Sequence, residues 1–410
     1  MMNISAIRAD FPQLAREVVG RPIVYFDNAA TSLKPTPVLG AMEGYYRTYC
    51  ANIHRGKHLL SEEASAAYEA SRETVAKFIN AKSVETIFVR GATEGIGLVA
   101  AGLSLKANEN VVGTVLEHHS NILPWRGYCA YRGAPLTPDG LPDLEAAEAL
   151  IDEHTRAITI TMCSNVTGVI VEVEPWARMA HQNGLPLLVD AAQCGAHLKL
   201  DVEKMDCDFL VLSGHKMFGP TGSGILYGKR ERLESLRPPT LGGGTVNRVY
   251  ADYSFDLRDL PWRLEAGTPD IAAVIGLAAA VEYIEELGLD QIEARTQELS
   301  DSLAAHLGNL PGIQPCSPAP GIKRTSLVSF ALENEKLSSD YITRLLSDTY
   351  GIMVRGGHHC AHPLHEYLKI KSGTVRASLQ FYNTEEEIDY FSHALSNVLN
   401  LVAVGGRVGI

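Results

Sequence analysis

A lysine and an aspartate that follow two apolar segments are the residues of this sequence best suited to chemistry. Residues 185–189 (LPLLV) and 208–212 (DFLVL) have the length of strands; Asp190 ends the first segment and Lys216 follows the second. In an open α/β sheet, ligands bind where the strands end at their carboxyl edge. A carboxylate and an amine at that edge form either a salt bridge or a site for a cofactor that needs both.

Two sets of hydrogen-bond donors suited to a phosphate accompany this lysine. Ala92 and Thr93 stand between an expected strand and an expected helix, where free backbone N–H groups and the helix dipole favour an anion. Ser213 and His215 add two side-chain donors within three residues of Lys216. Threonines that merely cap helices are common, so the first set is informative only together with the second.

Pyridoxal phosphate accounts for all of these residues. Lys216 would form the Schiff base, Asp190 would pair with the pyridinium nitrogen, and the hydroxyl and N–H groups would hold the phosphate. His118 would lie over the face of the ring. We prefer this interpretation to a plain salt bridge because five expected strand ends agree with it.

These strand ends belong to a repeated pattern of short apolar strand, polar cluster and helix. The alternation predicts a parallel sheet with right-handed crossovers. Three further strands are expected at 86–89, 111–116 and 157–162. The five strands would bring these residues to one edge: Thr93, His118, Asn165, Asp190 and Lys216. A helix from Ser61, as N-cap, to about Ile79 precedes them.

A second domain is expected after a helix that begins with Thr268 as N-cap and ends near Gly288. Beyond it the pattern changes to α+β, with strands at 325–332, 352–354 and 374–379 and a helix at 338–350. Thr384 and Glu387 form a capping box that opens a last helix. We predict a large domain over residues 21–280 and a smaller one over 281–410, with residues 1–20 packing on the smaller.

A histidine-rich segment in the second domain, GIMVRGGHHCAHPLHE at 351–366, surrounds a single cysteine. A thiol among histidines and Arg355 is typical of a reactive thiolate at Cys360. His358, Cys360 and His362 alternate, so in an extended segment they would share a face and could bind a metal. An inert buried cysteine is the third interpretation.

Arg376 stands inside an expected strand of the second domain. Its guanidinium suits a substrate carboxylate, which it can bind through two parallel hydrogen bonds. A structural ion pair is the alternative.

Composition limits the class of protein. The 410 residues carry a formal net charge of −12, which disfavours nucleic acids and anionic membranes as partners. Seven scattered cysteines without a C-x-x-C pair suit a reducing compartment, and the N-terminus lacks the apolar core of a secretory signal, so we expect a soluble cytoplasmic protein. No G-x-G-x-x-G follows a first strand, which argues against a nicotinamide-dependent dehydrogenase.

Nine motifs resemble the class V, fold-type I pyridoxal-phosphate family, nearly from end to end. They are DNAATS, ANIHRGKHLLSEEAS, RGATEGI, EHHSNILPW, SNVTG, VDAAQ, SGHKMFGPTGSGILY, EAGTPD and RGGHHCAHP. The lysine motif is shared across the wider family, whereas R-x-G-H-H-C is similar to the narrower Suf-type, or group II, cysteine desulfurases. The resemblance implies a large domain with a mainly parallel seven-stranded sheet and a smaller C-terminal α+β domain.

The resemblance also implies individual roles. Lys216 would be the Schiff-base lysine, His118 would stack on the ring, and Gln193 would reach its phenolic oxygen. The other implied contacts are Asp190 to the ring nitrogen; Ala92, Thr93, Ser213 and His215 to the phosphate; Thr268 to the phosphate of a partner subunit; Asn165, Arg355 and Arg376 to the substrate; and Cys360 to the sulfur.

The implied reaction converts L-cysteine to L-alanine and leaves a persulfide on Cys360, for iron–sulfur cluster assembly or another sulfur-acceptor pathway. A homodimer and an acceptor protein would be its partners. The alternatives are a selenocysteine or cystine lyase, or another class V enzyme that does not use Cys360. His362 departs from the family pattern, where glutamine or methionine is more usual, and this leaves the preferred substrate open.

Overall fold

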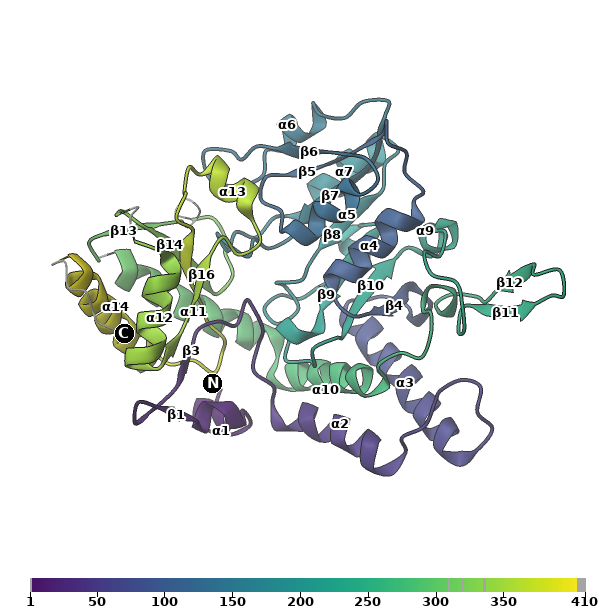
Figure 1. Ribbon diagram of the computed structural model, residues 1–410, viewed down its shortest axis with the longest axis horizontal. Helices are drawn as coiled ribbons and strands as arrows, with labels where there is room; N and C mark the ends of the chain where they lie inside the picture. Colours follow the sequence, from purple (N-terminus) through teal and green to yellow (C-terminus); the bar gives the residue numbers. More distant parts are fainter. Residues whose placement is uncertain (1, 309, 317, 319–320, 335–336, 404–410) are drawn as a thin grey trace.

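The computed structural model describes residues 2–308, 310–316, 318, 321–334 and 337–403, which form two main sheets with their own helices and three two-stranded sheets (Figure 1). Residues 404–410 of the predicted second domain lie outside this range. The large sheet and its helices occupy one side of Figure 1 and the small sheet the other, with α10 (Ile271–Leu287) running beneath the large sheet.

The large sheet has seven strands, as predicted. Its order is β4 (Thr86–Val89), β10 (Gly224–Gly228), β9 (Phe209–Ser213), β8 (Leu187–Asp190), β7 (Thr155–Thr161), β5 (Asn110–Thr114) and β6 (Ala130–Ala134). All neighbouring strands are parallel except β10, which is antiparallel to both of its neighbours. The predicted mainly parallel sheet is confirmed.

Both faces of this sheet are buried, which explains the continuous apolar runs of its strands. Val189 of β8 packs into one core and its neighbour Leu188 into another, because successive side chains of a strand point to opposite faces. The helices and turns of this half are α2 (Thr36–Thr48), α3 (Leu59–Phe78), η2 (Ser83–Glu85), α4 (Ala92–Gly102), η3 (His119–Asn121), α5 (Leu123–Arg126), α6 (Leu144–Glu148), α7 (Val173–Gln182), α8 (Val202–Met205), η4 (Gly214–Lys216), α9 (Arg230–Ser235) and η5 (Trp262–Leu264).

The small sheet is antiparallel and has its own core. Its strands run in the order β13 (Ile313–Pro315), β14 (Leu327–Leu332), β17 (Thr374–Ser378) and β16 (Arg355–Gly357). Around it lie α11 (Leu289–Gly308), α12 (Ser339–Tyr350), α13 (His362–Tyr367) and α14 (Glu385–Ala403). This α+β arrangement of strands and helices is the one predicted for the C-terminal part.

The N-terminal segment connects the two halves. It contains α1 (Ile4–Ala9), η1 (Pro12–Ala15), β1 (Glu17–Val18), β2 (Arg21–Pro22) and β3 (Val24–Tyr25). β3 pairs in parallel with β15 (Ile352–Met353), and Phe26 lies in the core of the small sheet.

The predicted domain boundary at residue 280 falls inside α10. Val281 and Ile284, which follow that boundary, lie in a core of the large sheet. The domain division at residue 280 stays a prediction.

Two predicted helix starts are wrong, and for the same reason. His58, not Ser61, is the N-cap of α3, because its Nδ1 accepts the Ser61 N–H while Ser61 lies inside the first turn. Asp270, not Thr268, caps α10, because its carboxylate accepts the Ala273 N–H at 3.0 Å. In both cases a nearer side chain reaches the free N–H groups.

The predicted capping box of α14 is confirmed. The Glu387 carboxylate accepts the Thr384 N–H at 3.2 Å, and the Thr384 hydroxyl accepts the Glu387 N–H at 3.3 Å.

A hairpin of β11 (Val246–Val249) and β12 (Phe255–Leu257) protrudes from the large half (Figure 1). Its tip exposes apolar surface, since 86% of Tyr253 is accessible. Among the described residues, no helix combines the length and the apolar character that crossing a membrane requires. All seven cysteines are free, and only Cys50 and Cys360 are exposed.

Candidate active site

A cavity of about 270 Å³ lies where the strands of the large sheet end, facing the small sheet. Twelve of the predicted site residues line it: Ala92, Thr93, His118, Asn165, Asp190, Gln193, Ser213, His215, Lys216, Arg355, Cys360 and Arg376. Thr268 does not line it and is exposed. The cavity therefore gathers predicted site residues that are up to 284 positions apart, from Ala92 at the start of α4 to Arg376 on the small sheet.

Lys216 and Asp190 face the same cavity, Lys216 from η4 and Asp190 from the end of β8. Burial lowers the pKa of Lys216, and the charge of Asp190 partly opposes this shift. Burial raises the pKa of Asp190, against the hydrogen bond from the Ala192 N–H at 3.0 Å and the charge of Lys216. The site thus holds an amine that gives up its proton more readily than an exposed lysine does.

His118 presents a neutral ring to the cavity. Burial, followed by the positive charge of Lys216, lowers its pKa to about 4. Its Nδ1 accepts the Ser120 N–H at 3.0 Å, so the proton of the neutral ring sits on Nε2. A neutral imidazole suits stacking against an aromatic ring.

The residues predicted to bind phosphate meet at the start of α4. The Ser213 hydroxyl accepts the Ala92 N–H at 2.9 Å, and the Thr93 hydroxyl shares a hydrogen bond of 2.7 Å with Ser120. His215 stays neutral because burial and then Lys216 lower its pKa to about 4. Donors around a helix N-terminus form an anion site.

Gly224 of the SGHKMFGPTGSGILY motif is tightly packed in the large sheet. A Cβ on Gly224 would stand 2.5 Å from the Leu212 carbonyl and 2.7 Å from the Gly91 Cα. Gly224 therefore has no room for a side chain, because its backbone lies against β9 and against Gly91, the N-cap of α4.

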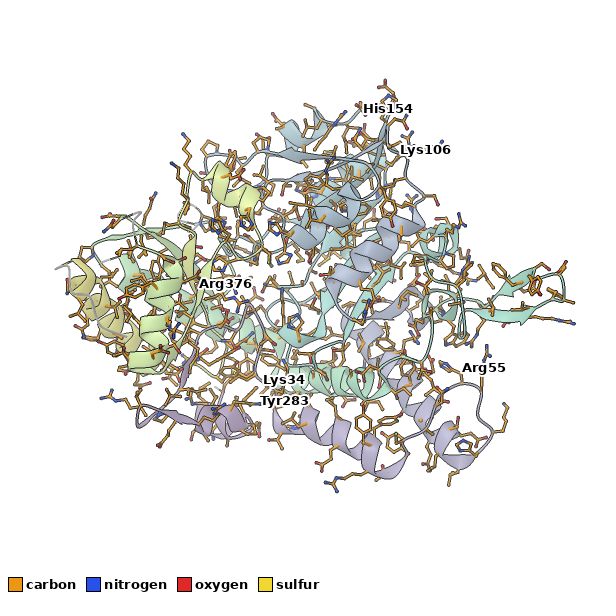
Figure 2. All side chains as sticks on the ribbon, in the orientation of Figure 1. Lys34, Arg55, Lys106, His154, Tyr283 and Arg376 are labelled. Carbon is orange, nitrogen blue, oxygen red and sulfur yellow. The ribbon has the colours of Figure 1, made fainter. Side chains whose placement is uncertain are left out.

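Arg376 reaches the cavity from β17 of the small sheet; Figure 2 labels it between the two halves. Its Nη1 donates to the Asn165 carbonyl at 2.8 Å, and its Nη2 lies 3.4 Å from Asp27 Oδ1. Its Nε is buried and has no hydrogen-bond partner within the described part of the chain. A buried guanidinium with a free donor suits a carboxylate ligand.

Cys360 stands at the mouth of this cavity in a turn between β16 and α13. His359 and Cys360 both have positive φ, 49° and 56°. The extended segment that would have aligned His358, Cys360 and His362 is therefore absent, because the chain turns and His362 begins α13. The described residues contain no group of three or more His, Cys, Asp or Glu side chains placed to hold a metal.

The donor set fits pyridoxal phosphate. The cavity offers a lysine amine, a buried carboxylate, a neutral imidazole and hydroxyls at a helix N-terminus, each of which matches one part of that molecule. Within the described residues the Nε of Arg376 has no partner, which leaves a donor for a second, carboxylate-bearing molecule. Lys216, His118, Asp190, Ser213 and Thr93 would hold the cofactor.

Sequence reasoning missed seven residues that line the cavity, among them Ser120 and His359. It also missed Asp27, which pairs with two of the lining arginines. Asp27 lies 3.5 Å from Arg355 and 3.4 Å from Arg376, and burial raises its pKa while the two arginines lower it. The DNAATS motif contains this aspartate, but only the fold shows which arginines it meets.

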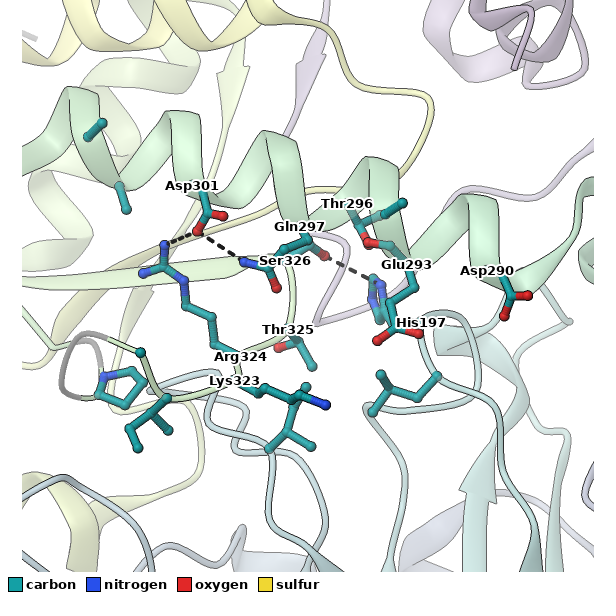
Figure 3. A pocket seen from close by; sticks show the side chains of 18 of the residues that line it. His197, Asp290, Glu293, Thr296, Gln297, Asp301, Lys323, Arg324, Thr325 and Ser326 are labelled. Carbon is teal, nitrogen blue, oxygen red and sulfur yellow. Dashed lines mark hydrogen bonds and ion pairs between the residues drawn. The ribbon is translucent and has the colours of Figure 1, made fainter. Parts of the chain in front are cut away.

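A larger cavity of about 990 Å³ lies elsewhere, between α11 and the segment Lys323–Ser326 (Figure 3). None of the predicted site residues lines it. Two of its charged residues, Arg324 and Asp301, form an ion pair at 2.7 Å. The residues with catalytic potential are in the smaller cavity.

A profile of the aminotransferase class-V proteins matches residues 24–391, most of the described chain. The chain belongs to this family. The match begins at β3 and ends within α14, so it covers both sheets and every residue that lines the cavity.

Relatives within the family are similar over nearly their whole length. A probable cysteine desulfurase of Halalkalibacterium halodurans is 44% identical over 96% of this chain and 97% of its own. A cysteine desulfurase of Escherichia coli strain K12 is 41% identical, over 98% of this chain and 100% of its own. The apo structure of a cysteine desulfurase from Thermococcus onnurineus NA1 superposes with a TM-score of 0.90, at 39% identity over 98% of this chain and 99% of that one.

Proposed function

We propose that this protein is a pyridoxal-phosphate-dependent cysteine desulfurase that converts L-cysteine to L-alanine and collects the sulfur on Cys360. The observation that carries the proposal is that a thiol, a lysine amine and a buried arginine line one small cavity. The named relatives, cysteine desulfurases at 41–44% identity, support it.

The substrate would be oriented by the small domain. Arg376, with its free Nε, binds the carboxylate, and Asn165 lies next to it. Arg355, exposed beside Asp27, completes a positive rim. This clamp places the substrate amine and Cα toward Lys216.

Proton transfer would fall to Lys216. Bound pyridoxal phosphate withdraws electrons from the substrate Cα and so makes its proton acidic. The lowered pKa of Lys216 makes its amine available as the general base that takes this proton. Asp190, which accepts a hydrogen bond from the Ala192 N–H, would supply the negative charge that pairs with the ring nitrogen of the cofactor.

Sulfur transfer would fall to Cys360. Its thiolate attacks the substrate sulfur, an S–S bond forms, and the C–S bond breaks. The electron pair of the C–S bond stays with Cβ, which takes a proton and becomes the methyl group of alanine. The enzyme is left with a persulfide, and no outside oxidant or reductant is needed.

The wider setting is also a proposal. We infer a cytoplasmic homodimer that passes its persulfide sulfur to an acceptor protein, for iron–sulfur cluster assembly or another pathway. The exposed apolar tip of the β11–β12 hairpin and the exposed Thr268, which would reach a partner's phosphate, support a second subunit.

Product analysis tests the proposal. Purified protein with bound cofactor is given L-cysteine, and alanine, pyruvate, free sulfide and protein persulfide are measured. We expect alanine and a persulfide at Cys360 in equal first-turnover amounts. Pyruvate with free sulfide would identify a lyase instead. Alanine from selenocysteine but not from cysteine would identify a selenocysteine lyase.

A further inference from the structure

The turn that carries Cys360 is strained and needs an anchor. Two consecutive residues other than glycine, His359 and Cys360, have left-handed backbone angles. Such a conformation costs about 1–3 kcal/mol per residue and persists only when the surroundings hold it. The Asn165 amide donates to the His359 carbonyl at 2.7 Å, which restrains one side of the turn.

On the other side of the turn, His119 makes two hydrogen bonds to the segment of Cys360. Its main-chain N–H donates to the Cys360 carbonyl at 2.8 Å. Its side-chain Nε2 lies 3.2 Å from the main-chain N–H of His362, which donates to it. His119 therefore hydrogen-bonds to the main chain at both Cys360 and His362.

The imidazole of His362 packs against the side chain of His119. Its ring stacks on that of His119 with centroids 5.0 Å apart and planes inclined by 15°. Its Nδ1 also lies 3.2 Å from His119 Nε2. For Nε2 to accept the main-chain N–H, His119 must be neutral; burial and then the neighbouring His362 lower its pKa, which favours that state.

We propose that His119 is a positioning residue that sets where the Cys360 thiol stands over the cofactor site. His119 follows His118 directly, so one short turn, η3, carries both the ring that faces the cavity and the anchor of the thiol. This inference rests on the proposed function, in which Cys360 must meet the substrate sulfur. A thiol displaced by about 1 Å can lose about a hundredfold in rate.

Matched variants test whether the acceptor atom Nε2 of His119 positions the Cys360 thiol. His119→Gln keeps an acceptor oxygen near the Nε2 position, whereas His119→Leu removes it. His362→Ala removes the stacked ring but keeps the main-chain N–H that His119 binds. With L-cysteine, we expect kcat to fall about 10- to 100-fold in His119→Leu, with KM and the cofactor absorption unchanged. His119→Gln should recover most of kcat, and His362→Ala should stay within about threefold of the unaltered protein.

A second measurement does not depend on desulfurase activity. In a Cys50→Ala background, which removes the other exposed cysteine, iodoacetamide alkylates Cys360, and mass spectrometry follows the rate. We expect His119→Leu to change this rate at least fivefold and His119→Gln to leave it near that of the parent. If the parent makes no alanine, the proposed function fails, while the alkylation rates still test the anchor.

Two outcomes would overturn the inference. In the first, His119→Leu keeps both kcat and the alkylation rate of the parent, so the side chain positions nothing. In the second, His119→Leu loses the cofactor absorption, which would assign His119 to the cofactor site rather than to the thiol.

Discussion

Arg376 of the small sheet donates from Nη1 to the main-chain carbonyl of Asn165, in the loop after β7 of the large sheet, at 2.8 Å. One side chain thus joins the two halves of the molecule at the cavity. Its Nε remains without a partner among the described residues. The contact that closes the site and the donor available for a substrate therefore belong to the same guanidinium.

Arg376→Lys should weaken substrate binding. Lysine keeps the charge but lacks the planar fork, so the paired hydrogen bonds to a carboxylate are lost. We expect KM for L-cysteine to rise about 10- to 100-fold, because a hydrogen bond to a charged group contributes about 1.5–3 kcal/mol. Arg324→Lys, in the other cavity, is the matched control and should not change KM. An unchanged KM in Arg376→Lys would remove Arg376 from the substrate site.

Two substitutions should separate cofactor binding from sulfur transfer. Lys216→Ala should abolish the visible absorption of the bound cofactor together with all activity. Cys360→Ala should keep that absorption but form no persulfide from L-cysteine. Absorption spectra and mass spectrometry of the protein check both results. Persulfide formation in Cys360→Ala would mean that another cysteine accepts the sulfur.

The buried Arg72 should be costly to remove alone. Its Nη1 lies 2.6 Å from Glu265 Oε1, which also accepts the Phe88 N–H at 2.7 Å. Arg72→Met leaves the carboxylate of Glu265 without its partner, which costs about 3–5 kcal/mol of unfolding free energy. Adding Glu265→Gln should recover part of that loss, as chemical unfolding would show. The exposed pair Arg344 and Asp348, 3.3 Å apart, is the control, with a coupling below about 1 kcal/mol.

Glu117, buried beneath the turn of His118, should make stability depend on pH. Burial raises its pKa from 4.5 to about 8, so the folded protein keeps a proton that the unfolded chain releases. The stabilisation is fully present below about pH 4.5 and is lost as the pH rises toward about 8. The glutamine side chain in the Glu117→Gln variant cannot lose a proton. The Tm of this variant should therefore rise relative to that of the unaltered protein as the pH increases from 5 to 9. Glu148→Gln, exposed on α6, should follow the unaltered protein; a constant Tm difference for Glu117→Gln would contradict the prediction.

Neighbouring residues at the start of α10 should have separate effects. Asp270→Ala removes the cap and should cost about 1 kcal/mol of unfolding free energy. Thr268→Ala should leave stability unchanged but weaken cofactor binding, because we propose that Thr268 reaches the phosphate of a partner subunit. Chemical unfolding and cofactor titration measure the two effects. A stability loss in Thr268→Ala and none in Asp270→Ala would reverse the assignment.

The pattern of apolar and polar residues was sufficient to predict an element where neighbours in the sequence decide the environment of each residue. The apolar runs before Asp190 and Ser213 predicted β8 and β9, since a strand buried on both faces has no polar positions. The predictions of Ser61 and Thr268 as N-caps were wrong because several polar side chains near each helix start can accept the same N–H groups. The backbone geometry decides which of them does so.

The sequence by itself determined that strand ends carry a lysine, a carboxylate and phosphate donors, because the strand pattern and the chemistry of these side chains are both local. The family resemblance implied that Arg376 and Cys360 join them, but only the tertiary structure shows the cavity that they share and the contacts of His119 with the Cys360 turn. These residues come from another sheet, and their contacts depend on how the two sheets pack. The spacing of residues within one segment does not predict how that segment packs against distant segments.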